Sequence, residues 1–351
     1  MRRFGLLLRS EFNLFRTALP VHLLAVFQPT VLYLLMSAIL VHPTADMAVL
    51  RPAGGEGRAL LAAMAQVGSP IGQPYIHLVL VDRTPDPLVQ LVVVEQGEDG
   101  TAAVQRYGLI DSNQVKNYRN RLTAAGLRLW NDALGERAVF VEEHPLLPDD
   151  VSYLVYFGMA LLPLTAFLAA SLIGGFLTAQ DFETHAIDEY RLAPLSMAVL
   201  LAARLTRLVL LALLSAGILL LAVGLLTGVW PDAVWRVGAI LIPVAVLAGG
   251  MGMTAGLLLR RVLPTFIVAL VTSIAGWLLG GAFGLPGGFG GPYEQVSRWM
   301  PNTFAVHLLF ARYYGADIGL PVRSALVLAA WGAGMLALTA LVYRRRVLGQ
   351  E

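Results

Sequence analysis

The sequence predicts an all-α polytopic membrane protein with six transmembrane helices, an N-terminal interfacial elbow helix and a small α+β extracytoplasmic domain. Three observations predict this fold class. Hydrophobic residues make up 57% of the chain and charged residues only 14%, a composition far more apolar than that of a soluble domain. Six apolar runs have the roughly 20 residues that a helix needs to cross the hydrocarbon core of a bilayer. A long polar insert separates the first run from the second.

The six apolar runs cover residues 21–41, 153–177, 208–228, 237–259, 262–283 and 324–343. The first run is longer than the apolar core of a secretory signal, and no convincing small-residue cleavage site follows it. We therefore expect it to be retained as a transmembrane helix. The chain contains no cysteine, which excludes disulfides, thiolate chemistry and cysteine-ligated metals.

The arginines predict the orientation of the chain. Cytoplasmic loops and helix ends are enriched in Lys and Arg, while long inserts such as residues 42–152 do not contribute to this bias. Twelve arginines then fall on the side of the N-terminus and four on the opposite side. We expect a multi-pass protein of the plasma membrane (a bacterial cytoplasmic or inner membrane), with both termini cytoplasmic and residues 42–152 extracytoplasmic. The twelve are Arg2, Arg3, Arg9, Arg16, Arg191, Arg204, Arg207, Arg260, Arg261, Arg344, Arg345 and Arg346, and the four are Arg236, Arg298, Arg312 and Arg323.

Residues 1–20 predict an amphipathic helix that lies in the membrane interface. One face of this helix is apolar and the other is basic, as in helices that lie along a lipid surface. It is either an anchor that fixes the topology or a movable elbow that also contacts a cytosolic partner. The residues that define the elbow are Phe4, Phe12 and Phe15 on the apolar face and Arg2, Arg9 and Arg16 on the basic face.

The insert, residues 42–152, carries 14 acidic and nine basic residues. Residues 75–82, 88–95 and 137–142 are rich in β-branched and apolar residues and predict strands. Residues 114–134 predict a helix, and the Pro- and Gly-rich stretch 42–74 predicts an irregular lead-in. His77 and His144 are isolated, so the insert shows no metal or catalytic constellation.

The chain lacks the motifs of several active membrane proteins. Its only lysine is Lys116, so it has no phosphate-binding G-x-x-x-x-G-K-[ST] loop, and no H-E-x-x-H zinc motif is present. The middle of each apolar run is also free of carboxylates and histidines, which mark many proton-coupled carriers; His22 lies near the inner end of the first run. We conclude that the chain is not an enzyme by itself and has no energy source of its own.

The inner loop between the second and third runs, residues 179–196, is a sizeable polar segment on the cytoplasmic side. It predicts a short charged helix ended by a proline. The acids in this loop either face a soluble partner or only solvate the loop and balance Arg204 and Arg207. Its charged residues are Asp181, Glu183, Asp188, Glu189 and Arg191, and Pro194 follows them.

The segment from the second run to the start of the third resembles the permeases of the ABC-2 type family, the membrane subunits of ABC exporters. Asp181 and Glu183 match the acidic pair of that family. Ile187 and Asp188 match its apolar–acidic turn, and Pro194-Leu195-Ser196 match the turn that opens the next helix. The sequence departs from the family pattern at His185-Ala186, where the family has Gly-Thr, and at Tyr190-Arg191, where it has two leucines.

The resemblance also covers the layout of the chain. An N-terminal elbow, a large outer domain after the first span and an outer excursion between the fifth and sixth spans are all similar to the family. The excursion, residues 284–322, resembles the short outer re-entrant helices of these permeases. Residues 153–351 are thereby expected to form transmembrane helices two to six.

The resemblance implies half of an exporter. Two permease chains would assemble, as a homodimer or with a paralogue, together with separate ABC ATPase subunits that bind ATP and Mg. The ATPase would contact Asp181, Glu183, Asp188, Glu189 and Arg191, with Pro194 fixing the exit of the loop helix. No cofactor is expected in this chain, and membrane lipids but no nucleic acid are expected as partners. Mild polar and aliphatic residues along the spans favour a hydrophobic or amphipathic cargo.

Three alternatives remain open from the sequence. The first is a non-transporting membrane subunit that relays force or a signal from an ATPase to the extracytoplasmic domain. The second is a membrane-embedded enzyme, which the missing catalytic pairs disfavour. The third is a secondary carrier, which the absence of mid-membrane carboxylates disfavours.

Overall fold

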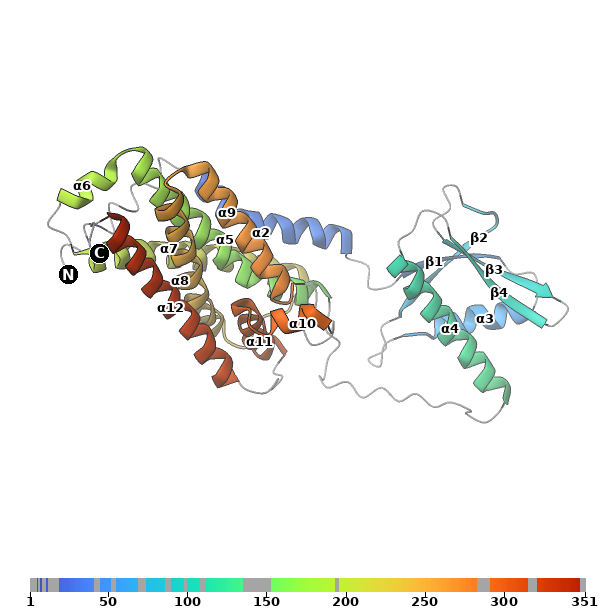
Figure 1. Cartoon of the computed structure of the whole chain (residues 1–351). Coiled ribbons are helices and arrows are strands. Elements are labelled where there is room, and N and C mark those ends of the chain that lie inside the picture. Colours follow the sequence, from blue (N-terminus) through green and yellow to red (C-terminus); the bar gives the residue numbers. More distant parts are fainter. Residues whose placement is uncertain are drawn as a thin grey trace. The chain divides into compact units, whose positions relative to one another are not determined.

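The computed structural model describes residues 5, 7, 11, 19–40, 45–51, 55–68, 74–85, 90–97, 100–107, 112–134, 153–192, 196–282, 291–314 and 321–347. The chain divides into two compact units (Figure 1). One unit comprises Met1–Ile39 with Tyr153–Glu351, and the other comprises Leu40–Ser152.

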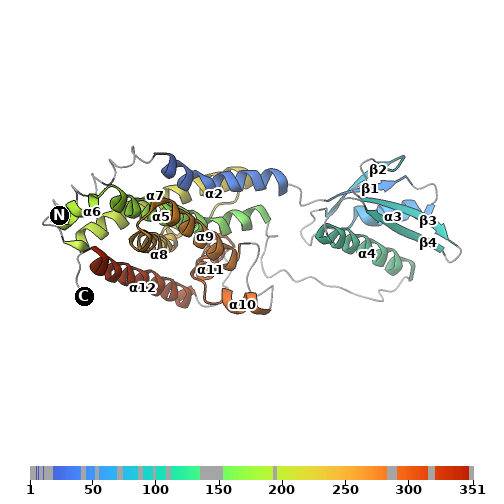
Figure 2. The ribbon, with the colours of Figure 1, turned by 45° about the horizontal axis from the view of Figure 1, so that its top comes forward.

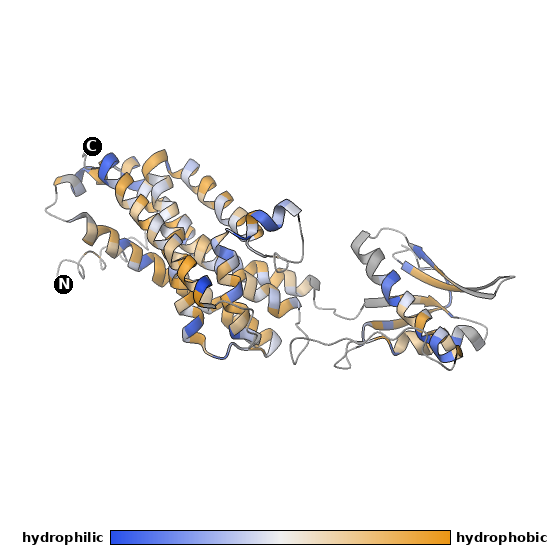
Figure 3. Cartoon of the chain, turned by 60° about the horizontal axis from the view of Figure 1, so that its bottom comes forward, coloured by the Kyte–Doolittle hydropathy of each residue, from blue (hydrophilic) through white to orange (hydrophobic). Residues whose placement is uncertain are grey.

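The first unit is a helix bundle. Among the described residues, six helices are long and apolar enough to cross a membrane, which confirms a polytopic membrane protein. Hydrophobic residues cover most of their length (Figure 3). The six are α2 (Leu19–Leu40), α5 (Tyr153–Glu183), α7 (Met197–Thr227), α8 (Val234–Leu259), α9 (Val262–Leu279) and α12 (Pro321–Val347). Three shorter helices join them: α6 (Ala186–Leu192), α10 (Gly291–Ser297) and α11 (Pro301–Tyr314).

Helix α5 is the centre of the bundle. It is buried over nearly its whole length and contacts α7, α8, α9 and α11, as two views of the bundle show (Figures 1 and 2). In the outer helices α2, α9 and α12, by contrast, most residues are not buried. In a bilayer these exposed faces meet lipid at no cost, because hydrocarbon is as apolar as the side chains themselves.

Small residues let α5 and α8 approach closely. Gly174 and Gly175 of α5 face the backbone of Gly249 and Gly252 of α8. A Cβ on Gly252 would overlap the backbone carbonyl of Ser171. This close approach of backbones is the usual way in which helices associate in a membrane, where the hydrophobic effect supplies no driving force between them.

Prolines lie inside α2, α5 and α8, and side chains of other helices bond to the backbone near two of these prolines. Pro29 lies within α2 and Pro163 within α5, and a proline weakens the hydrogen bonding of the preceding turn. The carbonyl three residues before Pro29, that of Val26, accepts a bond of 2.6 Å from Ser215 Oγ. The carbonyl three residues before Pro163 likewise accepts a bond of 2.8 Å from Trp277 Nε1. These two bonds join α7 to α2 and α9 to α5 close to the positions where each proline removes a bond from its own helix.

The spanning helices extend beyond the apolar runs that predict them. The third predicted run starts at residue 208, whereas α7 starts at Met197 and includes Arg204 and Arg207. The second predicted run ends at residue 177, whereas α5 continues through Asp181 to Glu183. The predicted bounds rest on apolar residues alone, so each predicted helix stops before the first charged residue. Here the charges stay within the helices because they neutralise one another.

The second unit is a four-stranded sheet covered by two helices. Its elements are β1 (Ala45–Leu50), α3 (Gly55–Ala65), β2 (Ile76–Val81), β3 (Gln90–Gly97), β4 (Gly100–Tyr107) and α4 (Ser112–Leu134). The strand order is β2-β1-β3-β4. β1 is parallel to β2 and β3, and β3 and β4 form an antiparallel pair in which Gly97 faces Gly100.

Helices α3 and α4 share one hydrophobic core with the sheet. Met47 and Val49 of β1, Met64 of α3 and Ala125 of α4 are buried together. The prediction of an irregular lead-in at 42–74 is wrong, because this stretch contains β1 and α3. The Pro and Gly residues around these two elements hid their apolar, buried residues from the sequence pattern. Strand β4 was not predicted. The expected strand 137–142 lies outside the described residues.

We predict that Gly252→Ala destabilises the bundle, because the new Cβ overlaps the Ser171 carbonyl and must separate α5 from α8. Overpacking of this kind costs about 1–3 kcal/mol. The matched control is Gly217→Ala in α7, where a Cβ has nothing within 4 Å. Thermal unfolding of the purified chain in detergent measures both. Equal midpoints for the two variants would contradict the close packing described here.

Candidate functional site

Three charged residues at the ends of α5 and α7 lie together in the interior of the protein. Arg204 Nη1 of α7 donates a bond of 2.7 Å to Asp181 Oδ2 of α5. Arg207 lies one turn further along α7. Asp181 is only 8% exposed, and Arg204 and Arg207 are more deeply buried still. The two arginines therefore belong to a buried charge cluster.

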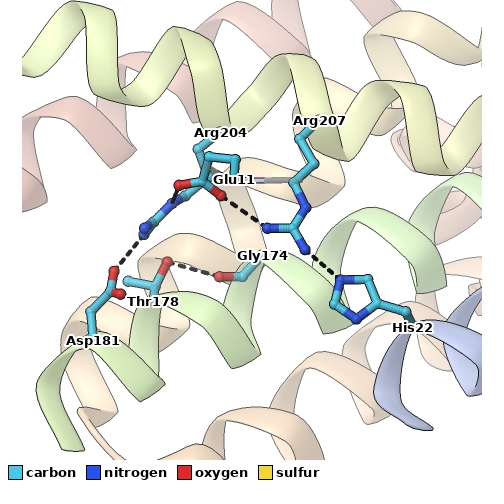
Figure 4. Close-up of polar contacts among 7 residues, drawn as sticks. All are labelled: Glu11, His22, Gly174, Thr178, Asp181, Arg204 and Arg207. Atoms are coloured by element: carbon cyan, nitrogen blue, oxygen red, sulfur yellow. Dashed lines mark hydrogen bonds and ion pairs between the residues drawn. The ribbon is translucent and has the colours of Figure 1, made fainter. Parts of the chain in front are cut away.

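Glu11, from the N-terminal segment, bridges the two arginines (Figure 4). Its Oε1 accepts from Arg204 Nε at 3.2 Å and its Oε2 accepts from Arg207 Nη1 at 3.1 Å. Glu11 is 3% exposed. Because each carboxylate oxygen serves a different guanidinium, this residue joins the N-terminal segment to two successive turns of α7.

His22, in the first turn of α2, is also part of the cluster. Its Nε2 lies 2.6 Å from Arg207 Nη2, and an arginine has only donors. Nε2 must therefore accept, so that a neutral His22 carries its proton on Nδ1. Glu11, Asp181, Arg204, Arg207 and His22 define what we call the charge cluster. Two carboxylates balance two guanidinium groups, which satisfies the requirement that buried charges be paired.

The short helix α6 rests on this charge cluster. Ile187 of α6 is buried, and the ring of Tyr190 lies 5.9 Å from the guanidinium carbon of Arg204. Burial raises the pKa of the Tyr190 hydroxyl above its ordinary value, which keeps it neutral. A cation beside the face of an aromatic ring is attracted by the ring quadrupole. One side of α6 is thus fixed to the same arginine that binds Glu11 and Asp181.

The other side of α6 is open to solvent. Asp188 and Glu189 are exposed in the first turn of α6. His185 precedes them with a φ of 58°, a left-handed conformation that turns the chain sharply between α5 and α6. Acids at the N-terminal end of a helix are stabilised by its dipole. The helix therefore presents an acidic surface on one side and an anchored surface on the other.

The structure separates the residues that the sequence groups in one loop. Asp181 is buried in the charge cluster and pairs with Arg204. This agrees with the interpretation that the loop acids balance Arg204 and Arg207. Glu183, the last residue of α5, accepts a bond of 2.8 Å from the backbone N–H of Val262 and so caps α9. Glu183, Asp188 and Glu189 are all exposed, but Glu183 is engaged with α9, and only Asp188 and Glu189 lie on α6.

The remaining predicted residues are not placed. Arg191 belongs to α6, and its side chain lies outside the described residues, as does Pro194. The elbow residues Arg2, Phe4, Arg9, Phe12, Phe15 and Arg16 also lie outside them. The turn that opens α7 is described at Ser196, whose Oγ accepts from the backbone N–H of Val199 at 3.4 Å and caps the helix.

Sequence reasoning missed Glu11 and His22. A signal for Glu11 exists, because it is the only acid among the first 45 residues of a chain whose N-terminal segment is basic. A single carboxylate in such a segment needs a cation as its partner, and Arg204 and Arg207 lie three residues apart on one face of a helix. Their partnership spans almost 200 residues and is invisible without the fold.

Two further observations concern metal sites and similarity to known proteins. No group of three or more His, Cys, Asp or Glu side chains suited to a metal ion occurs in the part of the chain that the structure describes. Compared with models of protein families and with curated proteins, the sequence matches none of them. The functional interpretation therefore rests on the geometry of this site.

We predict that breaking the charge cluster from either side destabilises the bundle. Arg204→Met removes the arginine that donates to Asp181, and Glu11→Gln leaves two arginines with one carboxylate. Removing one partner of a buried pair costs about 3–5 kcal/mol. Because both variants break the same contact, the double variant should lose less than the sum of the single losses.

Chemical unfolding in detergent micelles measures the three variants. The matched control is Arg236→Met, which removes an exposed arginine paired with Asp232 at 3.2 Å and should cost less than about 1 kcal/mol. Strictly additive losses for Glu11 and Arg204 would show that the two side chains do not interact.

Proposed function

We propose that this chain is the permease subunit of an ATP-driven exporter of the ABC-2 type, which moves a hydrophobic or amphipathic cargo outward. A separate ABC ATPase subunit binds ATP and Mg, docks on α6 and drives the cycle, and a second permease chain completes the transport unit. The observation that carries this proposal is the two-sided character of α6: Asp188 and Glu189 face solvent, while Ile187 and Tyr190 anchor the helix to the bundle.

The orientation of the bundle in this proposal follows from its arginines. Arg260 and Arg261 lie between α8 and α9, and Arg344, Arg345 and Arg346 end α12. These ends lie on the same side of the bundle as α6, because α5, α8 and α12 all end there. Arginine enrichment marks the cytoplasmic side, so α6 is accessible to a soluble ATPase. The unit Leu40–Ser152 and the re-entrant helices α10 and α11 then belong to the outer side.

The contacts of α6 give a path by which a push from the ATPase reaches the spanning helices. Displacing α6 displaces Tyr190 and with it Arg204, which holds α7, the end of α5 and the N-terminal segment together. Glu183 ties the end of α5 to the start of α9. The proline positions in α2 and α5 supply places where these helices can bend. Such rigid-body tilting is a common form of switching in membrane proteins and enzymes.

A second candidate function shares the same partner. A non-transporting subunit would relay the movement of α6 to the unit Leu40–Ser152, which is a compact body with its own core. The two functions differ in one measurable property. ATP hydrolysis by a transporter is stimulated by its cargo, whereas a relay hydrolyses ATP without cargo and moves none.

We predict that an ATPase with a P-loop co-purifies with the tagged chain from its native cells in mild detergent. The variant Asp188→Lys/Glu189→Lys should weaken this association about tenfold or more, because like charges across an interface cost several kcal/mol and 1.4 kcal/mol is a factor of ten. Charge reversal at Glu183 is avoided in this test, because that residue also caps α9.

The matched control reverses two exposed acids in the other unit, Asp82→Lys/Asp132→Lys. This control should retain the ATPase. A folded chain that brings down no ATPase, or a complex equally stable in both variants, would refute docking on α6.

A further inference from the structure

Helix α4 has one face built into the core of its unit. Ala125 is fully buried there, and Tyr118, Leu122 and Leu129 pack against the same cluster. Residues 118, 122, 125 and 129 repeat at the spacing of one helix face. At the flank of the packed face, the exposed Arg128 donates from its Nη1 to the carbonyl of Gln66 at 2.8 Å. These contacts fix the orientation of α4, and therefore which residues it presents on the opposite side.

The opposite face of α4 is apolar and uncovered. Leu127 is 43% exposed, and Trp130 and Leu134 are each 51% exposed. Their spacing of three and four residues places them on one stripe of the helix. Exposed apolar residues are ordinary when they are single, whereas a row of three with a tryptophan in the middle marks a surface that contacts something apolar.

The charges of α4 favour one kind of occupant. At 100° per residue, Arg119 lies on the Trp130 side of the stripe, about three turns before Trp130 along the helix, and is exposed. The only acid of α4 is Asp132, which lies on the side of the packed face. An apolar stripe beside a cation and without acids matches the surface of a bilayer with anionic headgroups. Tryptophan prefers that boundary, because its ring is apolar and its N–H is polar.

The connections of this unit keep it beside a bilayer. Four residues separate the end of α2 at Leu40 from the start of β1 at Ala45, and 18 residues separate Leu134 from the start of α5 at Tyr153. Both α2 and α5 are membrane-spanning by length and composition. At the start of α8, Trp235 is likewise exposed, and the Arg236 guanidinium lies 5.3 Å from the centre of its ring. At that position a helix enters the membrane.

We propose that the exposed face of α4 lies on the bilayer that the chain itself spans. The side chains of Leu127, Trp130 and Leu134 enter the boundary between headgroups and acyl chains, and Arg119 lies among anionic headgroups. This inference uses only the six spanning helices and the geometry of α4, so it holds whether or not an ATPase binds α6.

Single cysteines test this proposal in the full-length chain, which has none of its own. The variants Leu127→Cys and Leu134→Cys are labelled with a polarity-sensitive fluorophore and reconstituted in vesicles of phosphatidylcholine and phosphatidylglycerol. Lipids brominated near the headgroup end of the acyl chain serve as quenchers. The matched control is Ala62→Cys, an exposed position on α3 in the same unit.

We expect at least twofold stronger quenching at positions 127 and 134 than at position 62. Adding Trp130→Glu to the Leu134→Cys variant should return its quenching to the level of the control, because a carboxylate resists entry among acyl chains. Unchanged emission of the position 62 label in the corresponding Trp130→Glu variant shows that the unit is still folded. Quenching that is equal at all three positions would overturn the proposal.

A second copy of the chain is the competing occupant of this face, and the same labels distinguish it. In that case the label at position 127 emits as in an apolar environment but is not quenched by brominated lipid, and unlabelled Leu127→Cys chains form a disulfide-linked dimer under oxidation. That result would replace the bilayer with a protein partner and overturn the proposal as well.

Discussion

The neutralisation of Arg204 and Arg207 by Glu11 and Asp181 is the interaction on which the end of the bundle depends. Two guanidinium groups cannot be buried within a spanning helix without counter-charges, since the desolvation of each ion costs several kcal/mol. Glu11 supplies one charge from the N-terminal segment and Asp181 supplies the other from α5. With both carboxylates in place, α7 begins about three turns before its predicted apolar run. The same charges hold Arg204, against which Tyr190 of α6 packs.

This arrangement explains how a single short helix can connect to so much of the bundle. Tyr190 contacts Arg204, which in turn contacts both carboxylates. Arg207 extends the connection to His22 and thereby to α2. A network with shared partners behaves as a unit, because no member can move without leaving a buried charge unpaired. Such stiffness at one end is what the proposed docking of an ATPase on α6 requires, because a movement of α6 must reach the spanning helices.

The two compact units are stabilised by different physics. The unit Leu40–Ser152 has a sheet-and-helix core of Met, Val, Leu and Ile side chains, which the hydrophobic effect holds together in water. In the bundle, close backbone packing through Gly174, Gly175 and Gly252 takes over that role, because apolar side chains gain little by leaving lipid for protein. The exposed stripe of α4 takes no part in this core, which is why it needs a separate explanation.

The sequence by itself determined the number and approximate places of the spanning helices, because hydropathy over 20 residues is a local property that a bilayer enforces directly. It also located α4 through its periodicity, and β2 and β3 through their β-branched and apolar residues. It misjudged the stretch 42–74, where β1 and α3 are short and gain their order from the shared core with residues distant in the chain.

Only the tertiary structure decided which charged residues are accessible. Asp181 and Glu183 stand close to Asp188 and Glu189 in the sequence, yet the first is buried against Arg204 and the second caps α9. Glu11 finds its partners 193 and 196 residues away. Whether an acid is a docking residue or half of a buried pair depends on the fold around it, since the same carboxylate serves either purpose.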